Sequence, residues 1–190
     1  MSSSAVPPTV LLTGFEPFDG ASTNSSWEAV SRVGGIPNLV VGRLPVEFGR
    51  ASSVLASLIA AHSPDLVIAV GLAGDRAAIT PERVAINVED ARIADNAGAQ
   101  PSDRLIDPDG PDAHFTRLPV RAIVDAIAAA GIPASLSNSA GTFVCNSVMY
   151  RLLESTTVPA GFIHVPSEET MDVATIARGL EIAVRVAVSG

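Results

Sequence analysis

Three residues of this chain have side chains that could together carry out nucleophilic catalysis. The only cysteine, Cys145, follows the glycine-containing stretch "SAGTFV" and opens a segment with helical apolar spacing. A thiol attacks a carbonyl carbon when a base takes its proton and a third group orients that base. His164 ends the apolar run "GFIHVP" and is the candidate base, and Glu82 of "TPERVAIN" is the candidate orienting group. The three would form a site for acyl transfer.

Each of these residues also has an ordinary structural explanation. A lone cysteine is often a small buried hydrophobe, although the first turn of a helix lowers the pKa of a thiol. His164 fits a hydrogen-bonded core histidine, and Glu82 fits a surface charge paired with a nearby arginine. Of the other histidines, His62 is expected to cap the end of a helix, and His114 is expected to be solvated in a polar loop.

Two phenylalanines lie three residues apart in the polar loop "GFEPFDG", at Phe15 and Phe18. They either anchor the loop to the core or form aromatic walls of a small apolar pocket. The glycine-containing stretches "TGFEPFDG" and "GLAGDR" lack the spacing of the dinucleotide fingerprint and the Lys-Ser/Thr ending of a phosphate-binding loop. A phosphate site is therefore weakly supported.

The elements that must position these residues alternate along the chain. Apolar runs and alternating patterns predict strands, and three- and four-residue apolar spacing predicts helices. Residues 79–96 are expected to form two short strands or a hairpin, and residues 97–114 a long surface loop. The other strands are expected at 9–15, 38–46, 63–74, 132–141 and 160–167, and the helices at 25–33, 48–62, 119–131, 145–156 and 171–189.

Alternating strands and helices predict an α/β fold, a three-layer sandwich with a mainly parallel twisted sheet and helices on both faces. We expect a flexible tail over residues 1–8 and one domain over residues 9–190. In such folds functional groups gather at the carboxyl ends of the strands. The loops after residues 14, 72, 139 and 164 should therefore lie close together.

Composition excludes several other classes of function. The 190 residues carry a net charge of −8, which argues against a nucleic-acid partner or an anionic membrane surface. One cysteine cannot form an internal disulfide, and no cysteine–histidine cluster has zinc spacing. The N-terminus has no basic region before its first apolar run, and no run reaches membrane-spanning length. These features predict an unprocessed, cytoplasmic protein with no metal.

The motifs "LLTGFEPFDG", "SWEAV", "TPERVAIN", "ARIADN", "GTFVCN" and "GFIHVP" occur in this order between about residues 9 and 166. In order and spacing they resemble the pyroglutamyl peptidase I family of cysteine exopeptidases, also called pyrrolidone-carboxylate peptidases. The resemblance implies removal of an N-terminal pyroglutamyl (5-oxoproline) residue from peptides through a thioester acyl-enzyme, with no cofactor. It also implies a homo-oligomer, for which a tetramer is one candidate.

The resemblance also assigns roles to residues. It implies that Cys145 is the nucleophile, His164 the general base and then acid, and Glu82 the orienting group, with Arg92 and the Cys145 N–H stabilising the oxyanion. The flat, uncharged lactam would lie in an apolar pocket that penalises a desolvated ammonium group, and Asn24 and backbone groups near Leu72 would hydrogen-bond its N–H and C=O. The implied substrate-binding residues are Phe15, Phe18, Asn24, Val46, Leu72, Ile93, Phe143 and Val144.

The chain departs from the family pattern in a few places. Relatives usually carry Gln at Leu72, Gly at Asp75 and Thr at Val46, and many have a longer loop after the segment that holds His164. Two alternatives therefore stay open. One is a catalytically impaired relative that binds ligand on the same scaffold, and the other is a different α/β enzyme such as a nucleoside phosphorylase, which needs a phosphate site.

Overall fold

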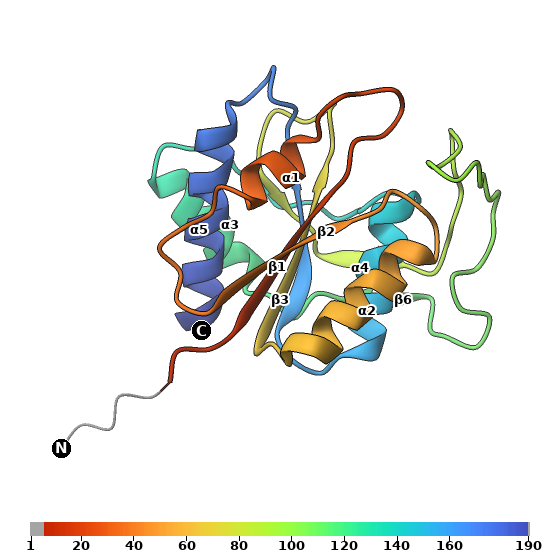
Figure 1. Cartoon of the computed structure of the whole chain (residues 1–190), viewed down its shortest axis with the longest axis horizontal. Coiled ribbons are helices and arrows are strands. Elements are labelled where there is room, and N and C mark those ends of the chain that lie inside the picture. The colour runs from red at the N-terminus through yellow and green to blue at the C-terminus, as the bar shows by residue number, and fades with distance from the viewer. Residues whose placement is uncertain (1–5, 190) are drawn as a thin grey trace.

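The computed structural model describes residues 6–189 and is built on a five-stranded sheet with the order β2-β1-β3-β7-β4 (Figure 1). The pairs β1–β2, β1–β3 and β3–β7 are parallel, and the short edge strand β4 runs antiparallel to β7. The strands are β1 (Val10–Phe15), β2 (Leu39–Leu44), β3 (Leu66–Leu72), β4 (Thr80–Pro81) and β7 (Ala160–Val165).

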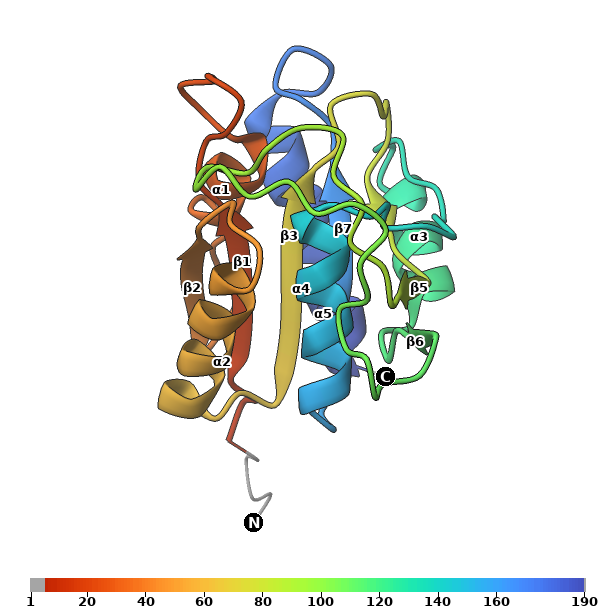
Figure 2. The ribbon, with the colours of Figure 1, turned by 90° about the vertical axis from the view of Figure 1, so that its right-hand side faces the viewer.

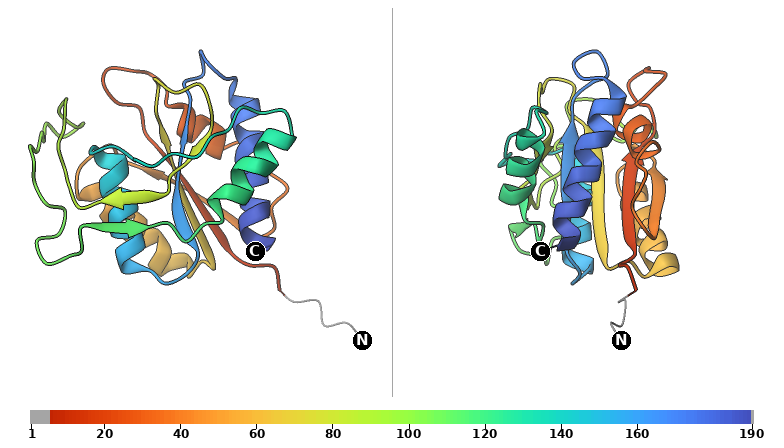
Figure 3. Two further views of the ribbon diagram at one scale, coloured as in Figure 1. Left: turned by 180° about the vertical axis from the view of Figure 1, so that it is seen from behind. Right: turned by 90° about the vertical axis from the view of Figure 1, so that its left-hand side faces the viewer.

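Helices cover both faces of this sheet. On one face α2 (Arg50–His62) and α4 (Val144–Ser155) lie side by side (Figure 2). On the other face lie α1 (Ser25–Val30), α3 (Val120–Ala129) and α5 (Val173–Ser189), with α5 packed against both α1 and α3 (Figure 3). The arrangement confirms the predicted α/β sandwich with a mainly parallel sheet.

The central strands are apolar on both faces because each face is covered by helices. In β3, Val67 and Ala69 pack into the core beneath α2 and α4, whereas Ile68 and Val70 pack into the core beneath α1 and α5. The same alternation in β7 places Phe162 in the core beneath α4, and His164, two residues on, projects from that same face. The candidate base therefore faces the helix that begins near Cys145.

A crevice opens between β1 and β3 at their carboxyl ends. From β1 the sheet grows toward β2 on one side and toward β3 on the other, so the strand order reverses at this point. The β1–β3 pairing stops at Thr13 and Ala69, which leaves the last three residues of β3 without a β1 partner. Open α/β sheets bind their ligands at such topological switch points.

One sequence prediction of a strand is wrong. Residues 132–141 form no strand and make only isolated bridges to Ile79 and Glu82. Serine side chains in this segment bond the backbone locally, as when Ser137 Oγ accepts from the Ser139 N–H, and such bonds compete with sheet pairing. Of the two alternatives for residues 79–96, the two short strands are confirmed: β4 pairs with β7, and β5 (Val84–Ile86) pairs with β6 (Ala113–Phe115). They form no hairpin with each other.

The remaining elements follow the prediction closely, and the loop predicted for residues 97–114 is irregular up to the start of β6. Residues 1–5 of the predicted tail lie outside the described residues. Pro7, also in the predicted tail, is bonded to the rest of the chain, since its carbonyl accepts a 2.7 Å hydrogen bond from Asn38 Nδ2. No helix among residues 6–189 combines the length and hydropathy needed to cross a membrane.

Candidate active site

The antiparallel pairing of β4 with β7 brings Glu82 and His164 together. The Glu82 N–H donates to the Phe162 carbonyl at 2.9 Å, so its side chain lies on the same face as His164. Glu82 Oε1 lies 2.7 Å from His164 Nδ1. The carboxylate is fully buried and the imidazole is 5 % exposed, so water does not compete for this contact. Nδ1 donates to the carboxylate, which leaves Nε2 as the nitrogen that can accept a proton.

Cys145 lies in the first turn of α4, as predicted, and its residue is partly exposed. The turn before the helix contains Gly141 in the left-handed region, with φ of 79°, where glycine is favoured. The thiol passes close to β3, because a Cβ atom built on Gly71 would lie 2.8 Å from Cys145 Sγ. Gly71 is the register partner of His164, so the sulfur and the imidazole lie over adjacent strands.

Cys145 and His164 open into one small cavity of about 110 Å3 at the switch point between β1 and β3. Pockets for drug-sized ligands are several times larger, so this volume suits a compact group. Its walls are mainly apolar, and Phe143 packs against both Phe18 and Phe48. The lining residues are Phe15, Phe18, Asn24, Val46, Leu72, Ala140, Phe143, Val144, Cys145 and His164.

The loops predicted to gather at one edge all contribute to this cavity. The loop after β1 supplies Phe18 and Asn24, β3 supplies Leu72, and the end of β7 supplies His164. Ala140 is a lining residue that sequence reasoning missed, although it belongs to the segment before Cys145 that was placed at this edge.

The pKa values of the two acidic groups, Glu82 and Cys145, are shifted in opposite directions. Burial alone would raise the pKa of Glu82, but the hydrogen bond and charge of His164, together with Arg76, outweigh it and hold that pKa below its usual value. Burial raises the pKa of the Cys145 thiol to about 12, and the Glu82 charge raises it further. The backbone at the start of α4 and the Arg76 charge lower this pKa, as expected for a helix N-terminus, but burial outweighs both.

Sequence reasoning also missed Arg76, which lies in the loop between β3 and β4. Its Nη1 donates to Glu82 Oε1 at 2.5 Å and to Thr80 Oγ1 at 2.6 Å, and its Nη2 donates to the Ser139 carbonyl at 3.0 Å. Sequence proximity pointed to Arg83 as a partner for Glu82. The available signal was the position of Arg76 just after β3, in a loop already predicted to lie at the site.

Asn24 has most of its hydrogen-bonding capacity committed. Its Oδ1 accepts from the Ser26 N–H and the Ser26 hydroxyl, which caps α1, and its Nδ2 donates to the Glu16 carbonyl. An amide nitrogen carries two hydrogens, so one N–H of Asn24 remains for a ligand. Asn24 can therefore donate to a carbonyl in the cavity, but its oxygen is already saturated as an acceptor.

The structure does not bring every candidate residue to the cavity. Arg92 is exposed and Ile93 is half-buried, and neither lines it. His62 is exposed, and the hydrogen bond that closes α2 comes instead from the Ser63 N–H to the Ile59 carbonyl. His114 is not solvated in a loop, because it belongs to β6 and its ring packs 4.6 Å from the ring of Tyr150.

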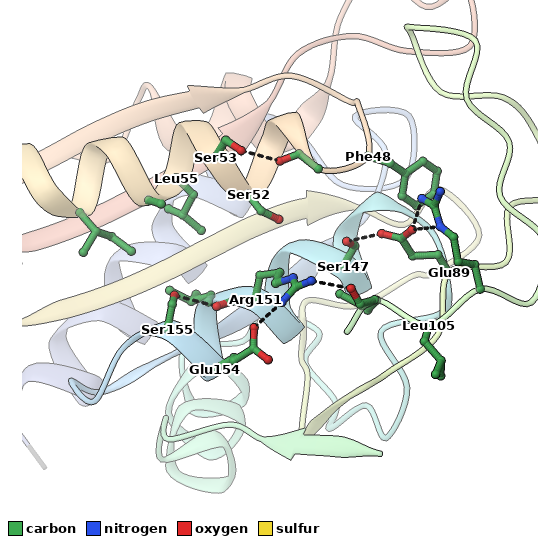
Figure 4. Close-up of a pocket in the computed structure, with 16 residues that line it drawn as sticks. Phe48, Ser52, Ser53, Leu55, Glu89, Leu105, Ser147, Arg151, Glu154 and Ser155 are labelled. Carbon is green, nitrogen blue, oxygen red and sulfur yellow. Dashed lines mark hydrogen bonds and ion pairs between the residues drawn. The ribbon is translucent and has the colours of Figure 1, made fainter. Parts of the chain in front are cut away.

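A larger hollow of about 500 Å3 lies between α2, α4 and the segment 104–106, but among the described residues that line it there is no member of the Cys–His–Glu set (Figure 4). Its polar groups are largely paired with one another. Ser147 donates to Glu89, which also pairs with Arg104, and Arg151 pairs with Glu154. The Ser147–Glu89 bond joins α4 to the loop beside it. Within residues 6–189 no cluster of three or more His, Cys, Asp or Glu residues could hold a metal ion.

Fold and site together define the class of protein. The site combines a thiol at the start of a helix with an imidazole at the end of a strand, and a buried carboxylate bonds Nδ1 of that imidazole. This is the arrangement of a cysteine-type hydrolase on an α/β scaffold. The family model described as "Pyroglutamyl peptidase" matches residues 8–189. The chain belongs to the pyroglutamyl peptidase family, a family of cysteine peptidases.

Relatives agree over nearly the whole chain. The pyrrolidone-carboxylate peptidase of Erwinia tasmaniensis is 50 % identical over 198 positions, which cover 95 % of this chain and 92 % of the relative. That of Bacillus licheniformis is 46 % identical, covering 92 % and 89 %. The crystal structure of pyroglutamyl peptidase I from Bacillus amyloliquefaciens superposes with a TM-score of 0.93 at 42 % identity, covering 96 % of this chain and 98 % of that one.

Proposed function

We propose that this protein is a cysteine exopeptidase that removes N-terminal pyroglutamyl residues from peptides through a triad of Cys145, His164 and Glu82. One observation carries the proposal. The thiol and the imidazole share a small apolar cavity, and the buried carboxylate bonds the imidazole nitrogen that faces away from it. The names of the relatives supply the substrate class.

Acylation begins from the neutral thiol. As Cys145 Sγ attacks the pyroglutamyl carbonyl carbon, its proton passes to His164 Nε2, and the carbonyl π electrons move onto oxygen. Glu82 stabilises the imidazolium that forms. Collapse of the tetrahedral intermediate breaks the C–N bond, and the imidazolium gives its proton to the departing amine. The products are a thioester on Cys145 and the shortened peptide.

Deacylation uses the same groups in reverse. Water attacks the thioester carbonyl while His164 Nε2 takes its proton, and the C–S bond then breaks. The thiolate recovers the proton from the imidazolium, and pyroglutamic acid leaves. One histidine therefore serves as base in each attack and as acid in each collapse.

The oxyanion in this proposal is held by the start of α4. The residue at the N-cap, Phe143, makes no side-chain capping bond, so the first N–H groups of the helix, including that of Cys145, are available to a ligand. Donors fixed where charge develops supply a large catalytic effect. Arg92 is exposed in the free protein, so the proposal assigns it no necessary part.

The cavity favours a lactam over an ordinary N-terminus. Phe15 and Val46 are nearly fully buried and, with Phe143, offer no partner to an ammonium group, so binding a charged amine would leave it desolvated. The free N–H of Asn24 donates to the lactam carbonyl. The lactam N–H requires an acceptor that Asn24 does not have, and the backbone near Leu72, which has no partner on the β1 side, supplies it.

Hydrolysis of a chromogenic pyroglutamyl amide tests the proposal directly. Wild-type protein should release the chromophore, Cys145→Ala should release none, and a prolyl amide, which presents an ammonium-type nitrogen in place of the lactam, should resist cleavage. Turnover by Cys145→Ala would overturn the assignment of the nucleophile. A folded wild type that binds the amide without cleaving it would support the alternative of a ligand-binding relative.

Two further expectations belong to this proposal. A thiol nucleophile works only when reduced, which favours a reducing cytoplasmic setting. A homo-oligomer follows from the family resemblance, and sedimentation of the purified protein would measure its size.

The segment after β7 is short, with α5 beginning at Val173. The alignment of 198 positions exceeds the 190 residues of the chain, so the Erwinia relative contains insertions relative to it.

A further inference from the structure

Arg76 joins three parts of the site that come from different regions of the chain. Its guanidinium bonds the carboxylate of Glu82, the hydroxyl of Thr80 and the carbonyl of Ser139. Thr80 is the register partner of His164, and Ser139 belongs to the segment that leads into α4 and Cys145. A planar guanidinium can satisfy separate acceptors in fixed directions, which an ammonium group cannot do.

The geometry at Glu82 shows why a cation is needed there. Oε1 accepts from both His164 Nδ1 and Arg76 Nη1, whereas the buried Oε2 has no hydrogen-bond partner among the described residues. A fully buried carboxylate beside a neutral imidazole would be an uncompensated charge, and such charges are strongly disfavoured. Arg76, whose side chain is 25 % exposed, supplies the compensating charge.

We propose that Arg76 is a positioning residue of the catalytic site, which keeps Glu82 ionised beside His164 and ties the loop before Cys145 to that pair. The inference rests on the proposed triad. Arg76 touches neither the thiol nor the cavity, since it does not line the pocket that Cys145 and His164 share. It acts through Glu82 and through the Ser139 carbonyl.

The pH dependence of catalysis should report this role. The ionisable groups that act on Glu82 are His164 and Arg76, those that act on Cys145 are Glu82 and Arg76, and the neighbouring Asp75 is exposed. Catalysis needs the unprotonated form of the coupled Glu82–His164 pair. Removing a cation beside the pair favours its protonated forms, so the acid limb of kcat/KM should move to higher pH.

The experiment compares Arg76→Met, Arg76→Lys and the control Arg83→Met, which also loses one positive charge but makes no ion pair with Glu82 among the described contacts. Arg76→Met should lower kcat/KM at neutral pH by about 10- to 100-fold, the effect of losing a hydrogen bond between charged groups. Its acid limb should move up by about one pH unit. Arg76→Lys should restore the acid limb while kcat stays below wild type, because one ammonium cannot reach both Glu82 and Ser139.

The outcomes separate this inference from the triad itself. If Arg76→Met loses only thermal stability and keeps the wild-type pH profile, Arg76 is structural and the inference fails while the triad stands. An equal shift in Arg83→Met would also overturn it, because any nearby charge would then suffice. Activity in Cys145→Ala would instead show that the triad assignment is wrong.

Discussion

Replacing Glu82 by glutamine removes a buried charge while it keeps the shape of the side chain. Because Oε1 accepts from both His164 and Arg76, the amide oxygen can take its position and keep both contacts. The amide nitrogen would then occupy the position of Oε2, which has no hydrogen-bond partner among the described residues. Glu82→Gln should therefore fold, with a loss in unfolding free energy of about 1–3 kcal/mol for the buried, unsatisfied N–H groups.

The larger effect should fall on catalysis. His164 becomes an imidazolium as it takes the thiol proton, and an ionised carboxylate about 4 Å from that charge stabilises it by about 4 kcal/mol at an effective dielectric constant of about 20. In Glu82→Gln this attraction is lost, and the Arg76 charge beside the imidazolium is no longer neutralised. We expect kcat/KM for a pyroglutamyl amide to fall by about 1000-fold.

Steady-state kinetics at several pH values and a urea titration measure these two effects separately. Glu82→Asp is the matched control, since it keeps the charge but shortens the side chain, and it should recover part of the lost activity. A decrease in kcat/KM of less than about tenfold in a folded Glu82→Gln protein would refute the reasoning. Glu82 would then stabilise the fold without assisting the proton transfer.

Three other predictions follow from close contacts and from the thiol. Gly71→Ala places a methyl group 2.8 Å from Cys145 Sγ and should lower kcat by about 100-fold. The control Gly74→Ala, whose added methyl group has nothing within 4 Å, should leave kcat unchanged. Equal kcat values for the two variants would contradict this prediction. Tyr150→Phe removes the 2.8 Å hydrogen bond to the Pro111 carbonyl and should lower the free energy of unfolding by about 1 kcal/mol, and an unchanged urea midpoint would be evidence against that bond. Because burial raises the pKa of Cys145 to about 12, alkylation of the free protein by iodoacetamide should keep rising between pH 6 and pH 9, and a plateau in that range would indicate a preformed thiolate.

The parts of the fold that were predicted correctly are those whose local pattern and tertiary environment agree. The continuous apolar run of β3 is buried on both faces, and the spacing in α2 and α5 matches one buried side of each helix. Residues 132–141 were predicted wrongly because alternation among small polar residues was taken for a strand. The segment makes only isolated bridges to Ile79 and Glu82, and from Ser137 onward serine hydroxyls bond the local backbone, which hydrophobic periodicity does not show.

The site shows the same division between local and long-range information. Cys145 and His164 were placed at the correct edge because strand ends and helix starts are local features. Arg76 was missed because its partner Glu82 reaches it only after β4 pairs with the far side of β7. Likewise, Arg92 and Ile93 were implied by the family motif "ARIADN", and neither lines the cavity. Pairing between strands that are far apart in the sequence decides such contacts, and local sequence patterns do not predict that pairing.

The raised pKa of the thiol and the proposed selectivity for a lactam have one physical cause. The apolar walls that leave an ammonium group desolvated also disfavour a resting thiolate. A cavity that excludes charge therefore makes a preformed anionic nucleophile unfavourable in free energy. The anion must instead form during the attack, when the imidazole takes the proton and the developing negative charge moves to an oxyanion at the start of α4. In the proposed mechanism the rate then depends on the strength of the base His164, which Glu82 contacts directly and Arg76 reaches through Glu82. A variant that adds a polar side chain to the wall, such as Val46→Thr, should therefore lower the pKa of the thiol and also weaken discrimination against the prolyl amide. A change in only one of these two properties would show that they do not share a cause.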